Sequence, residues 1–268
     1  MTIDTSKPRV LITGASSGIG KALAHIHASR GGHLVLVARS ADRLNALAKE
    51  LREKHSIDVK VIAKDLTQVA APQEIFDELK GAGIEIDYLI NNAGFGGQGA
   101  FHQRKWEDDA SMIQLNIVAL THLTHLFLPE FVRRGHGKIL NVSSTASLMA
   151  GPLQAVYYAT KAYVTSFSNA IAEELRGTGV TVTALLPGVT ETEFATTSGM
   201  NKTPLFTNAK LATAETVARA GYEGMLSGKL DVIAGVTFAQ RMMISMVPLT
   251  PKGVLLKQIH AMQKSANA

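Results

Sequence analysis

Tyr157, Lys161 and Ser144 are the residues whose types and spacing point most directly to chemistry in this 268-residue chain. Tyr157 and Lys161 stand four positions apart in a stretch expected to be helical, which puts both side chains on one face. A phenol with an ordinary pKa of about 10 exchanges protons poorly at neutral pH unless a nearby positive charge stabilises the phenolate. Lys161 can supply that charge, and the Ser144 hydroxyl can hold a substrate carbonyl against the phenol. The stretch therefore predicts an active site, although Tyr157 and Lys161 alone would also fit an ordinary helix pair.

The segments around these residues predict the elements that position them. An apolar run over 138–143 predicts a buried strand, so that Ser143 and Ser144 lie at its carboxyl end, where open α/β sheets bind ligands. A helix over about 156–176 carries Tyr157 and Lys161. The spacing from Tyr157 makes Ser144, and not Ser143, the candidate catalytic serine. Ser143 is therefore predicted to be a structural hydroxyl. Tyr158 is predicted to be a core or interface aromatic.

The rest of the chain alternates short apolar runs with helical patterns. The expected strands are 9–13, 34–38, 59–63, 86–90, 180–186 and 230–233, and the expected helices are 18–30, 41–54, 72–80, 106–133 and 213–227. This alternation predicts an α/β fold with right-handed crossovers and a doubly wound parallel sheet. Neither a linker nor an internal repeat interrupts it, so residues 1–268 are expected to form one domain. A substrate loop is expected near 190–210, and an apolar, Met-rich extension starts at about residue 234.

A glycine-rich turn separates the first expected strand from the first expected helix. Its sequence from residue 14 is Gly-Ala-Ser-Ser-Gly-Ile-Gly, which places glycines at positions 14, 18 and 20. Glycines let the backbone approach a pyrophosphate closely, and the free N–H groups at the start of a helix favour its negative charge. The turn therefore predicts a phosphate-binding site.

Composition narrows the possible functions. The formal net charge is +5 and the pI about 9.4, but the basic residues are scattered, which argues against nucleic-acid binding. The chain contains no cysteine, so disulfides and thiolate metal sites are excluded. His122 and His125 are three apart on an expected helix, but no third ligand accompanies them and no metal site is predicted. No apolar leader or membrane-spanning run was recognised, so a cytoplasmic protein is expected.

Seven motifs together resemble those of the short-chain dehydrogenase/reductase family. They are Thr13–Gly20, Asp65-Leu66, Asn91–Gly94, Asn116, Ser144, the Tyr157 and Lys161 pair, and Pro187–Thr192, in the family's order over roughly residues 8–192. The resemblance implies a Rossmann-like sheet of about seven strands and a nicotinamide cofactor. It also implies a catalytic tetrad in which Tyr157 passes a proton, Lys161 holds the cofactor ribose and lowers the pKa of the phenol, Ser144 orients the carbonyl, and Asn116 holds a relay water.

The same resemblance implies a cofactor-binding set beyond Tyr157 and Lys161. Residues expected near the phosphates, the adenine, the riboses and the carboxamide are Gly14, Ser16, Ser17, Gly18, Ile19, Gly20, Arg39, Ser40, Asp65, Leu66, Asn92, Ala93, Gly94, Pro187, Gly188, Val189 and Thr192.

The residues after the second expected strand predict which nicotinamide cofactor is used. NAD-selective sites place a carboxylate there to accept hydrogen bonds from the ribose 2′-hydroxyl. This chain has Arg39 and Ser40 instead, and a guanidinium can grip a 2′-phosphate through charge-assisted hydrogen bonds. Asp42 is the other residue that could bind the ribose 2′-hydroxyl, but it lies at the expected start of a helix, where acidic residues are common. NADP is therefore expected in preference to NAD.

The expected function is the NADP-dependent interconversion of a carbonyl and an alcohol. The alternatives are an epimerase or dehydratase that recycles its nicotinamide, and a non-catalytic nucleotide sensor. Apolar residues in the segments expected to cover the site suggest an apolar substrate, namely Phe194, Met200, Leu205, Phe206, Phe238, Met242, Met243 and Met246. A homodimer or homotetramer is expected from surplus apolar residues on two helices, namely Leu120, Leu123, Leu126, Phe127, Val164, Phe167 and Ile171.

Overall fold

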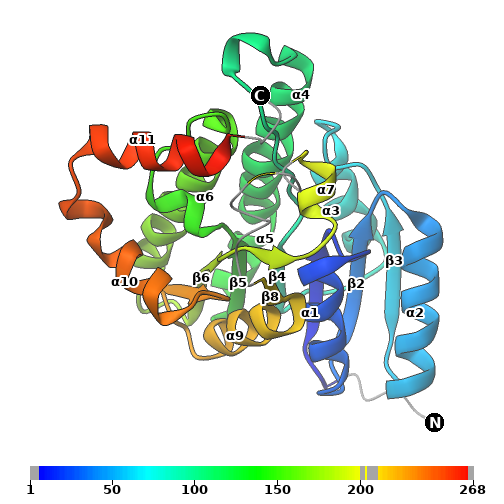
Figure 1. Ribbon diagram of the computed structural model, residues 1–268. Coiled ribbons are helices and arrows are strands. Elements are labelled where there is room, and N and C mark those ends of the chain that lie inside the picture. The colour runs from blue at the N-terminus through cyan, green and yellow to red at the C-terminus, as the bar shows by residue number, and fades with distance from the viewer. Residues whose placement is uncertain (1–5, 200–202, 204–210, 265–268) are drawn as a thin grey trace.

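The computed structural model describes residues 6–199, 203 and 211–264, and its core is a seven-stranded parallel sheet with helices on both faces (Figure 1). The strand order is β3-β2-β1-β4-β5-β6-β9. The strands are β1 (Arg9–Thr13), β2 (His33–Ala38), β3 (Val59–Ala63), β4 (Tyr88–Asn91), β5 (Gly137–Val142), β6 (Val180–Pro187) and β9 (Asp231–Ala234). The order reverses direction between β1 and β4, which creates a crevice at the carboxyl ends of the strands. The predicted doubly wound, Rossmann-like fold is confirmed.

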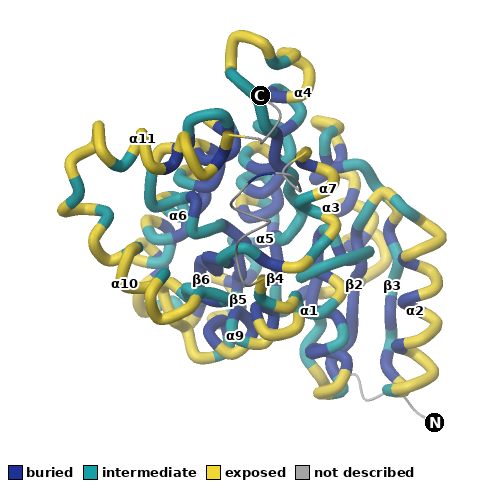
Figure 2. Tube along the Cα trace, viewed as in Figure 1, coloured by how far each residue is buried: buried dark blue, intermediate teal, exposed yellow. Residues whose placement is uncertain are grey.

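Two helical layers cover the sheet. One layer contains α1 (Gly18–Ala28), α2 (Ala41–His55) and α9 (Ala214–Leu226), and the other contains α3 (Ala71–Gly81), α5 (Leu120–Arg134) and α6 (Ala155–Glu174). Side chains of each strand alternate between the layers: Val10 and Ile12 pack in the first core, and Leu11 packs in the second. The inner strands β1, β2, β4, β5 and β6 are therefore largely buried (Figure 2), as continuous apolar runs predicted, whereas the edge strands β3 and β9 are partly exposed.

The helix predicted over 106–133 contains a π-helical turn. α4 (Trp106–Ile113) leads into this turn at Gln114–Ala119, and α5 follows directly. By length and composition the stretch Trp106–Arg134 could cross a membrane, with a mean hydropathy of 1.3 over its most apolar window. Its side chains Leu123 and Phe131, however, pack under the sheet with the strands. The stretch therefore serves as a core helix of the domain.

The apolar residues that suggested a subunit interface mostly face the core of the same chain. Leu120, Leu123, Phe127, Val164 and Ile171 are all buried. Their apolar character is explained by the sheet they cover, so they carry no argument for association.

The predicted loop over 190–210 begins with a short strand β7 (Thr190–Glu191) and a short helix α7 (Phe194–Thr197), and β7 pairs with β8 (Ala212–Thr213). Met200, Leu205 and Phe206 lie outside the described residues. Short 3₁₀ helices occur at Phe101–Gln103 and Thr145–Leu148.

The extension after β9 forms two helices joined by a 3₁₀ turn. They are α10 (Phe238–Met246), the turn η4 (Val247–Leu249) and α11 (Lys252–Gln263), and residues 237–263 are called the C-terminal strap below. α10 starts with a capping box, in which Thr237 accepts from the backbone of Gln240 and Gln240 accepts from the backbone of Thr237. None of the α10 side chains is buried, and α11 buries only Ile259 and Gln263. The strap lies at one end of the sheet, and most of it is exposed (Figures 1 and 2).

Candidate active site

A single cleft of about 1610 Å³ runs along the carboxyl ends of the strands and holds nearly all of the predicted site residues. Every residue predicted to be catalytic or cofactor-binding lines this cleft except Gly20 and Asn116. The glycine turn lies toward one end of the cleft, and residues of the strap such as Met246 and Ile259 form a wall of it. The structure therefore brings the predicted phosphate site and the predicted chemistry into one continuous space.

The turn between β1 and α1 has room for backbone only. Gly14 has a φ of +66°, and a Cβ there would come within 2.8 Å of the Asn92 amide nitrogen. A Cβ on Gly20 would lie 2.3 Å from the Gly14 carbonyl oxygen, which explains why Gly20 is needed although it does not line the cleft. The Asn92 amide donates to the carbonyls of Thr13 and Gly14 at 2.9 and 3.1 Å. Asn92 thus holds the turn in shape, a structural part that the sequence did not suggest.

The start of α1 fits an anionic group. Its N-cap residue, Ser17, makes no side-chain capping bond, and the first turn carries no acidic residue. The first backbone N–H groups of a helix lack partners within the helix, and they attract negative charge. Gly18 and Ile19 from this turn line the cleft. The residues present therefore fit a phosphate-bearing cofactor.

Arg39 and Ser40 follow β2 and line the cleft, as predicted. Arg39 is exposed and makes no ion pair with any residue that the structure describes. Asp42 lies in the first turn of α2 and does not line the cleft, so its side chain is not positioned as a ribose ligand. Arg43, also in the first turn of α2, pairs with Glu193 at 2.9 Å, and both residues line the cleft.

Asp65 and Leu66 come after β3 at the same edge. One carboxylate oxygen of Asp65 accepts hydrogen bonds from the backbone and the hydroxyl of Thr67, at 3.0 and 2.9 Å. This pair fixes the turn that carries Leu66, which is buried against the second core.

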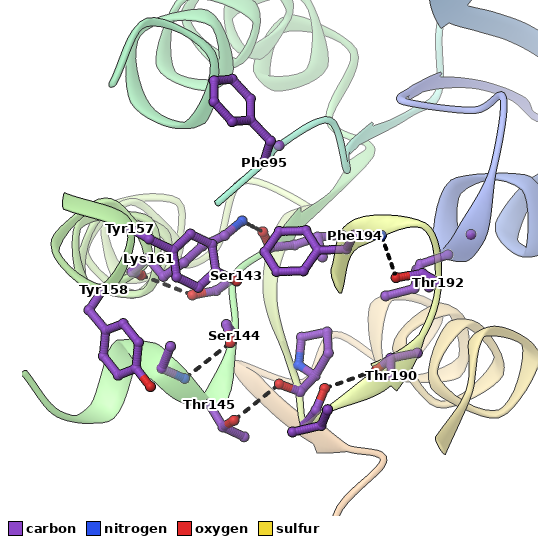
Figure 3. Close-up of a pocket in the computed structure, with 18 of the residues that line it drawn as sticks. Phe95, Ser143, Ser144, Thr145, Tyr157, Tyr158, Lys161, Thr190, Thr192 and Phe194 are labelled. Atoms are coloured by element: carbon purple, nitrogen blue, oxygen red, sulfur yellow. Dashed lines mark hydrogen bonds between the residues drawn. The ribbon is translucent and has the colours of Figure 1, made fainter. Parts of the chain in front are cut away.

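Tyr157, Lys161 and Ser144 line the same part of the cleft, and Figure 3 shows their side chains near one another. The phenol is almost wholly buried, and the Phe194 ring lies 5.4 Å from it between centroids. Lys161 donates to the carbonyl of Val142 at 2.8 Å, and its ammonium lies 5.9 Å from the Tyr157 ring centre. The lysine is therefore fixed between the end of β5 and the phenol.

Burial disfavours the charged forms of Lys161 and Tyr157 and so shifts the pKa values of both. It lowers the pKa of Lys161 to about 8 and raises the pKa of Tyr157 above its ordinary value, while a hydrogen bond from Ser144 acts in the opposite direction on Tyr157. The expectation that Lys161 lowers the pKa of the phenol stays a prediction; desolvation by burial is the largest cause of the rise in the pKa of Tyr157. Burial thus favours the protonated phenol, which is the form that can donate a proton.

Asn116 lies behind the cleft, in the π-helical turn. Its amide donates to the Phe95 carbonyl at 2.9 Å and to the Thr160 hydroxyl at 3.1 Å, and its carbonyl accepts from the Phe95 N–H. A Cβ on Gly94 would lie 3.0 Å from the Asn116 oxygen and 3.4 Å from the Lys161 nitrogen. Asn116 therefore ties the loop after β4 to α6, and its amide oxygen lies near Lys161.

Ser143 and Tyr158 have the structural roles that the sequence analysis predicts for them. The buried Ser143 hydroxyl bonds the Lys161 carbonyl at 2.9 Å and the Thr165 hydroxyl at 2.7 Å. Tyr158 is buried, and its hydroxyl accepts from Gln263 of the strap at 2.7 Å. Ser143 thus anchors the carboxyl end of β5 to α6, and Tyr158 anchors α11.

The loop over the phenol is held by residues that the sequence analysis missed. A Cβ on Gly96 would lie 3.4 Å from the Tyr157 ring, and the next residue packs against the guanidinium of Arg104. Arg104 pairs at 2.8 Å with Asp109, which is 2% exposed, and donates to the Gln98 carbonyl at 2.9 Å. The five-residue spacing of Arg104 and Asp109 matches no helical pair, so only the folded structure reveals the pair.

The apolar residues predicted to surround the substrate divide into two groups. Phe194, Met242, Met243 and Met246 line the cleft, whereas Phe238 does not and is 80% exposed. The prediction that Phe238 covers the site is therefore wrong, because Phe238 lies in the first turn of α10 and is turned to solvent.

Comparisons with known proteins agree with this geometry. The family model for short chain dehydrogenases matches residues 8–203. The very-long-chain 3-oxoacyl-CoA reductase of Macaca fascicularis is 36% identical over 195 residues, which cover 69% of this chain and only 60% of that relative. A sulfoacetaldehyde reductase of Chromohalobacter salexigens is 40% identical over 188 residues, covering 69% of this chain and 73% of the relative.

Solved structures extend the similarity over almost the whole chain. A short-chain dehydrogenase from Sphingobium yanoikuyae in complex with NADPH superposes with a TM-score of 0.81 and 35% identity, covering 92% of this chain and 94% of that one. A bulky-bulky ketone specific alcohol dehydrogenase from Comamonas testosteroni gives a TM-score of 0.78 at 32% identity, over 94% of each chain. The chain belongs to the short-chain dehydrogenase/reductase family.

Proposed function

We propose that this protein is an NADP(H)-dependent oxidoreductase that interconverts a carbonyl and an alcohol. The observation that carries the proposal is the meeting of Tyr157, Ser144 and Lys161 in a cleft that continues to the glycine turn and Arg39. When bound, the nicotinamide supplies or accepts the hydride. The family relatives named as reductases and the neighbour that contains NADPH support this assignment.

The position of each of the four predicted catalytic residues suggests its role in the reaction. The Ser144 hydroxyl donates to the carbonyl oxygen of the substrate and holds it beside the phenol. Tyr157 gives its proton to that oxygen in reduction and takes it back in oxidation. Lys161 offsets the negative charge that develops on the phenolate, and Asn116 leads proton exchange away from the site through a water near Lys161.

The glycine turn and the start of α1 would hold the phosphates of the dinucleotide, and Arg39 with Ser40 would hold a 2′-phosphate. Arg39 supports NADP(H) because its charge is not neutralised by any carboxylate in the described part of the chain. The substrate is expected to be apolar around its carbonyl, since Phe194, Met246 and Ile259 wall the cleft.

The test is a screen of carbonyl compounds with NADPH, followed by the stoichiometry of the best substrate. The panel runs from small polar ketones and free sugars to aromatic and long aliphatic ketones. The proposal predicts one NADPH oxidised for each alcohol formed, and faster turnover of the apolar compounds. Product formation without net NADPH consumption would indicate the epimerase or dehydratase alternative, and tight NADPH binding without any turnover would indicate a sensor.

A cytoplasmic location and a homodimer or homotetramer remain predictions. Some apolar side chains of the long helices stay half-exposed on the described surface, namely Val118, Val132 and Tyr163. Light scattering of the purified protein would decide the oligomeric state, and a monomer at micromolar concentration would contradict this prediction.

A further inference from the structure

The C-terminal strap exposes large apolar side chains although it belongs to a folded chain with a full core. Phe238 is 80% exposed, Leu249 76%, Met243 63% and Val254 50%. These four residues come from α10, η4 and α11, and further half-exposed apolar residues on the same elements are Met242, Met246, Leu256 and Met262. Large apolar side chains exposed together on consecutive elements are candidates for an interaction site.

The charged side chains of the strap are all basic. No aspartate or glutamate follows Asp231 anywhere in the sequence, whereas Arg241, Lys252 and Lys257 are exposed on the strap. Among the described residues none of these three cations pairs with a carboxylate. The surface is therefore apolar and cationic, the combination that binds the surface of an anionic bilayer.

A second copy of the chain fits this surface less well. In a two-fold contact the same patch meets itself, so the cations of two straps would be brought into one interface without any carboxylate from the same segment. Like charges brought together in an interface oppose association. Anionic lipid headgroups remove this repulsion and leave the apolar side chains to enter the boundary with the acyl chains.

The strap is also a wall of the active-site cleft. Met243 and Met246 of α10 and Leu255, Ile259 and Met262 of α11 line the cleft, while Phe238, Leu249 and Val254 of the same strap do not. The strap is fixed at its far end, where the buried Gln263 donates to Tyr158 and accepts from Gln154. One side of the strap thus faces the cleft, and its remaining apolar residues are free to contact another surface.

We propose that the C-terminal strap docks this protein on anionic lipid surfaces, with Phe238, Leu249 and Val254 inserted among the lipids and Arg241, Lys252 and Lys257 at the headgroups. The cleft wall then lies against the membrane. If the proposed function holds, an apolar carbonyl substrate reaches the cleft from the lipid, but docking itself does not depend on that activity.

The test is co-sedimentation of the purified full chain with vesicles of phosphatidylcholine alone and of phosphatidylcholine mixed with phosphatidylglycerol. We expect binding to the mixed vesicles that weakens as salt is raised, because the headgroup attraction is screened. The double variant Phe238→Ser with Leu249→Ser should bind at least roughly tenfold more weakly, since two large apolar side chains no longer leave water. Lys252→Gln with Lys257→Gln should reduce binding to the mixed vesicles.

Val69→Ser is the matched control, since Val69 is 72% exposed, lies before α3 and does not line the cleft. It should bind vesicles like the unchanged protein, and all variants should keep the same circular dichroism spectrum and thermal midpoint. The proposal is overturned if the unchanged protein stays in the supernatant with both vesicle types, or if the double variant binds as well as the control. It is also overturned if light scattering shows that the double variant dissociates an oligomer, because the strap would then be a contact between copies.

Discussion

Arg39 is the residue on which the choice between NADPH and NADH depends in this account. Its guanidinium lies at the cleft edge after β2 without an ion pair among the described residues, so it is available to a 2′-phosphate. Arg39→Ala should lower the preference in kcat/KM for NADPH over NADH by roughly tenfold to a hundredfold, the value of hydrogen bonds to a charged group. Arg219→Ala, an exposed arginine outside the cleft, is the control and should leave the ratio unchanged. A preference of the unchanged protein for NADH would contradict the assignment.

His27 should make stability depend on pH. It is buried between the Tyr222 hydroxyl at 2.6 Å and the Pro8 carbonyl at 3.0 Å, and burial lowers its pKa to about 4. Between about pH 6.5 and pH 4 the unfolded chain binds the proton and the folded chain does not, so stability is lost as the pH falls through this range. Urea unfolding should show a loss of about 2 kcal/mol from this group between about pH 7 and pH 5. His27→Gln should reduce that pH dependence, and an unchanged dependence would assign it to other groups.

At the scale of elements, the π-helical turn between α4 and α5 positions Asn116. π-turns are often found at functional sites, and this one lets a single amide reach both the Phe95 backbone and Thr160. Asn116→Ala should lower the free energy of unfolding by on the order of 2 kcal/mol, because it leaves the Phe95 N–H and carbonyl without these partners. It should also lower kcat, since Phe95 adjoins Gly96 in the loop that packs against Tyr157. Asn45→Ala on the exposed face of α2 should change neither the free energy of unfolding nor kcat. Equal effects of the two variants would contradict the role assigned to the π-helical turn.

The sequence indicated some elements well and others poorly, for physical reasons. β1 and β2 are continuous apolar runs, because both faces of a parallel strand are buried, and their bounds were predicted closely. The strap was not recognised as helical, because its apolar residues follow no buried stripe; the capping box at Thr237 and Gln240 was the signal that could have located α10. The π-turn leaves no mark in the hydrophobic pattern, since it shifts the helix by a single residue.

The candidate site was predictable where chemistry restricts the residue types. Tyr157, Lys161 and Ser144 were found by spacing and type, and Gly14 by its place between a strand and a helix. The supports were not predictable: the Gln263 anchor depends on a contact between distant segments, and the spacing of Arg104 and Asp109 matches no helical pair. Such positions are determined by the packing of the chain, and no local pattern records them.

At the scale of the whole molecule, the fold places one cleft at the point where the strand order reverses, with the glycine turn, the phenol and the strap around it. The central claim is that Tyr157 passes the proton in a carbonyl reduction within this cleft. Tyr157→Phe removes only the hydroxyl and keeps the ring that packs against Phe194.

The most direct measurement is therefore the comparison of Tyr157→Phe with the unchanged protein, using the best carbonyl substrate from the screen. The account predicts that NADPH binding, followed by fluorescence titration, stays within about twofold, while kcat falls by roughly 10² to 10⁴-fold, the contribution typical of acid–base catalysis. Equal turnover by the variant and the unchanged protein would contradict the central claim.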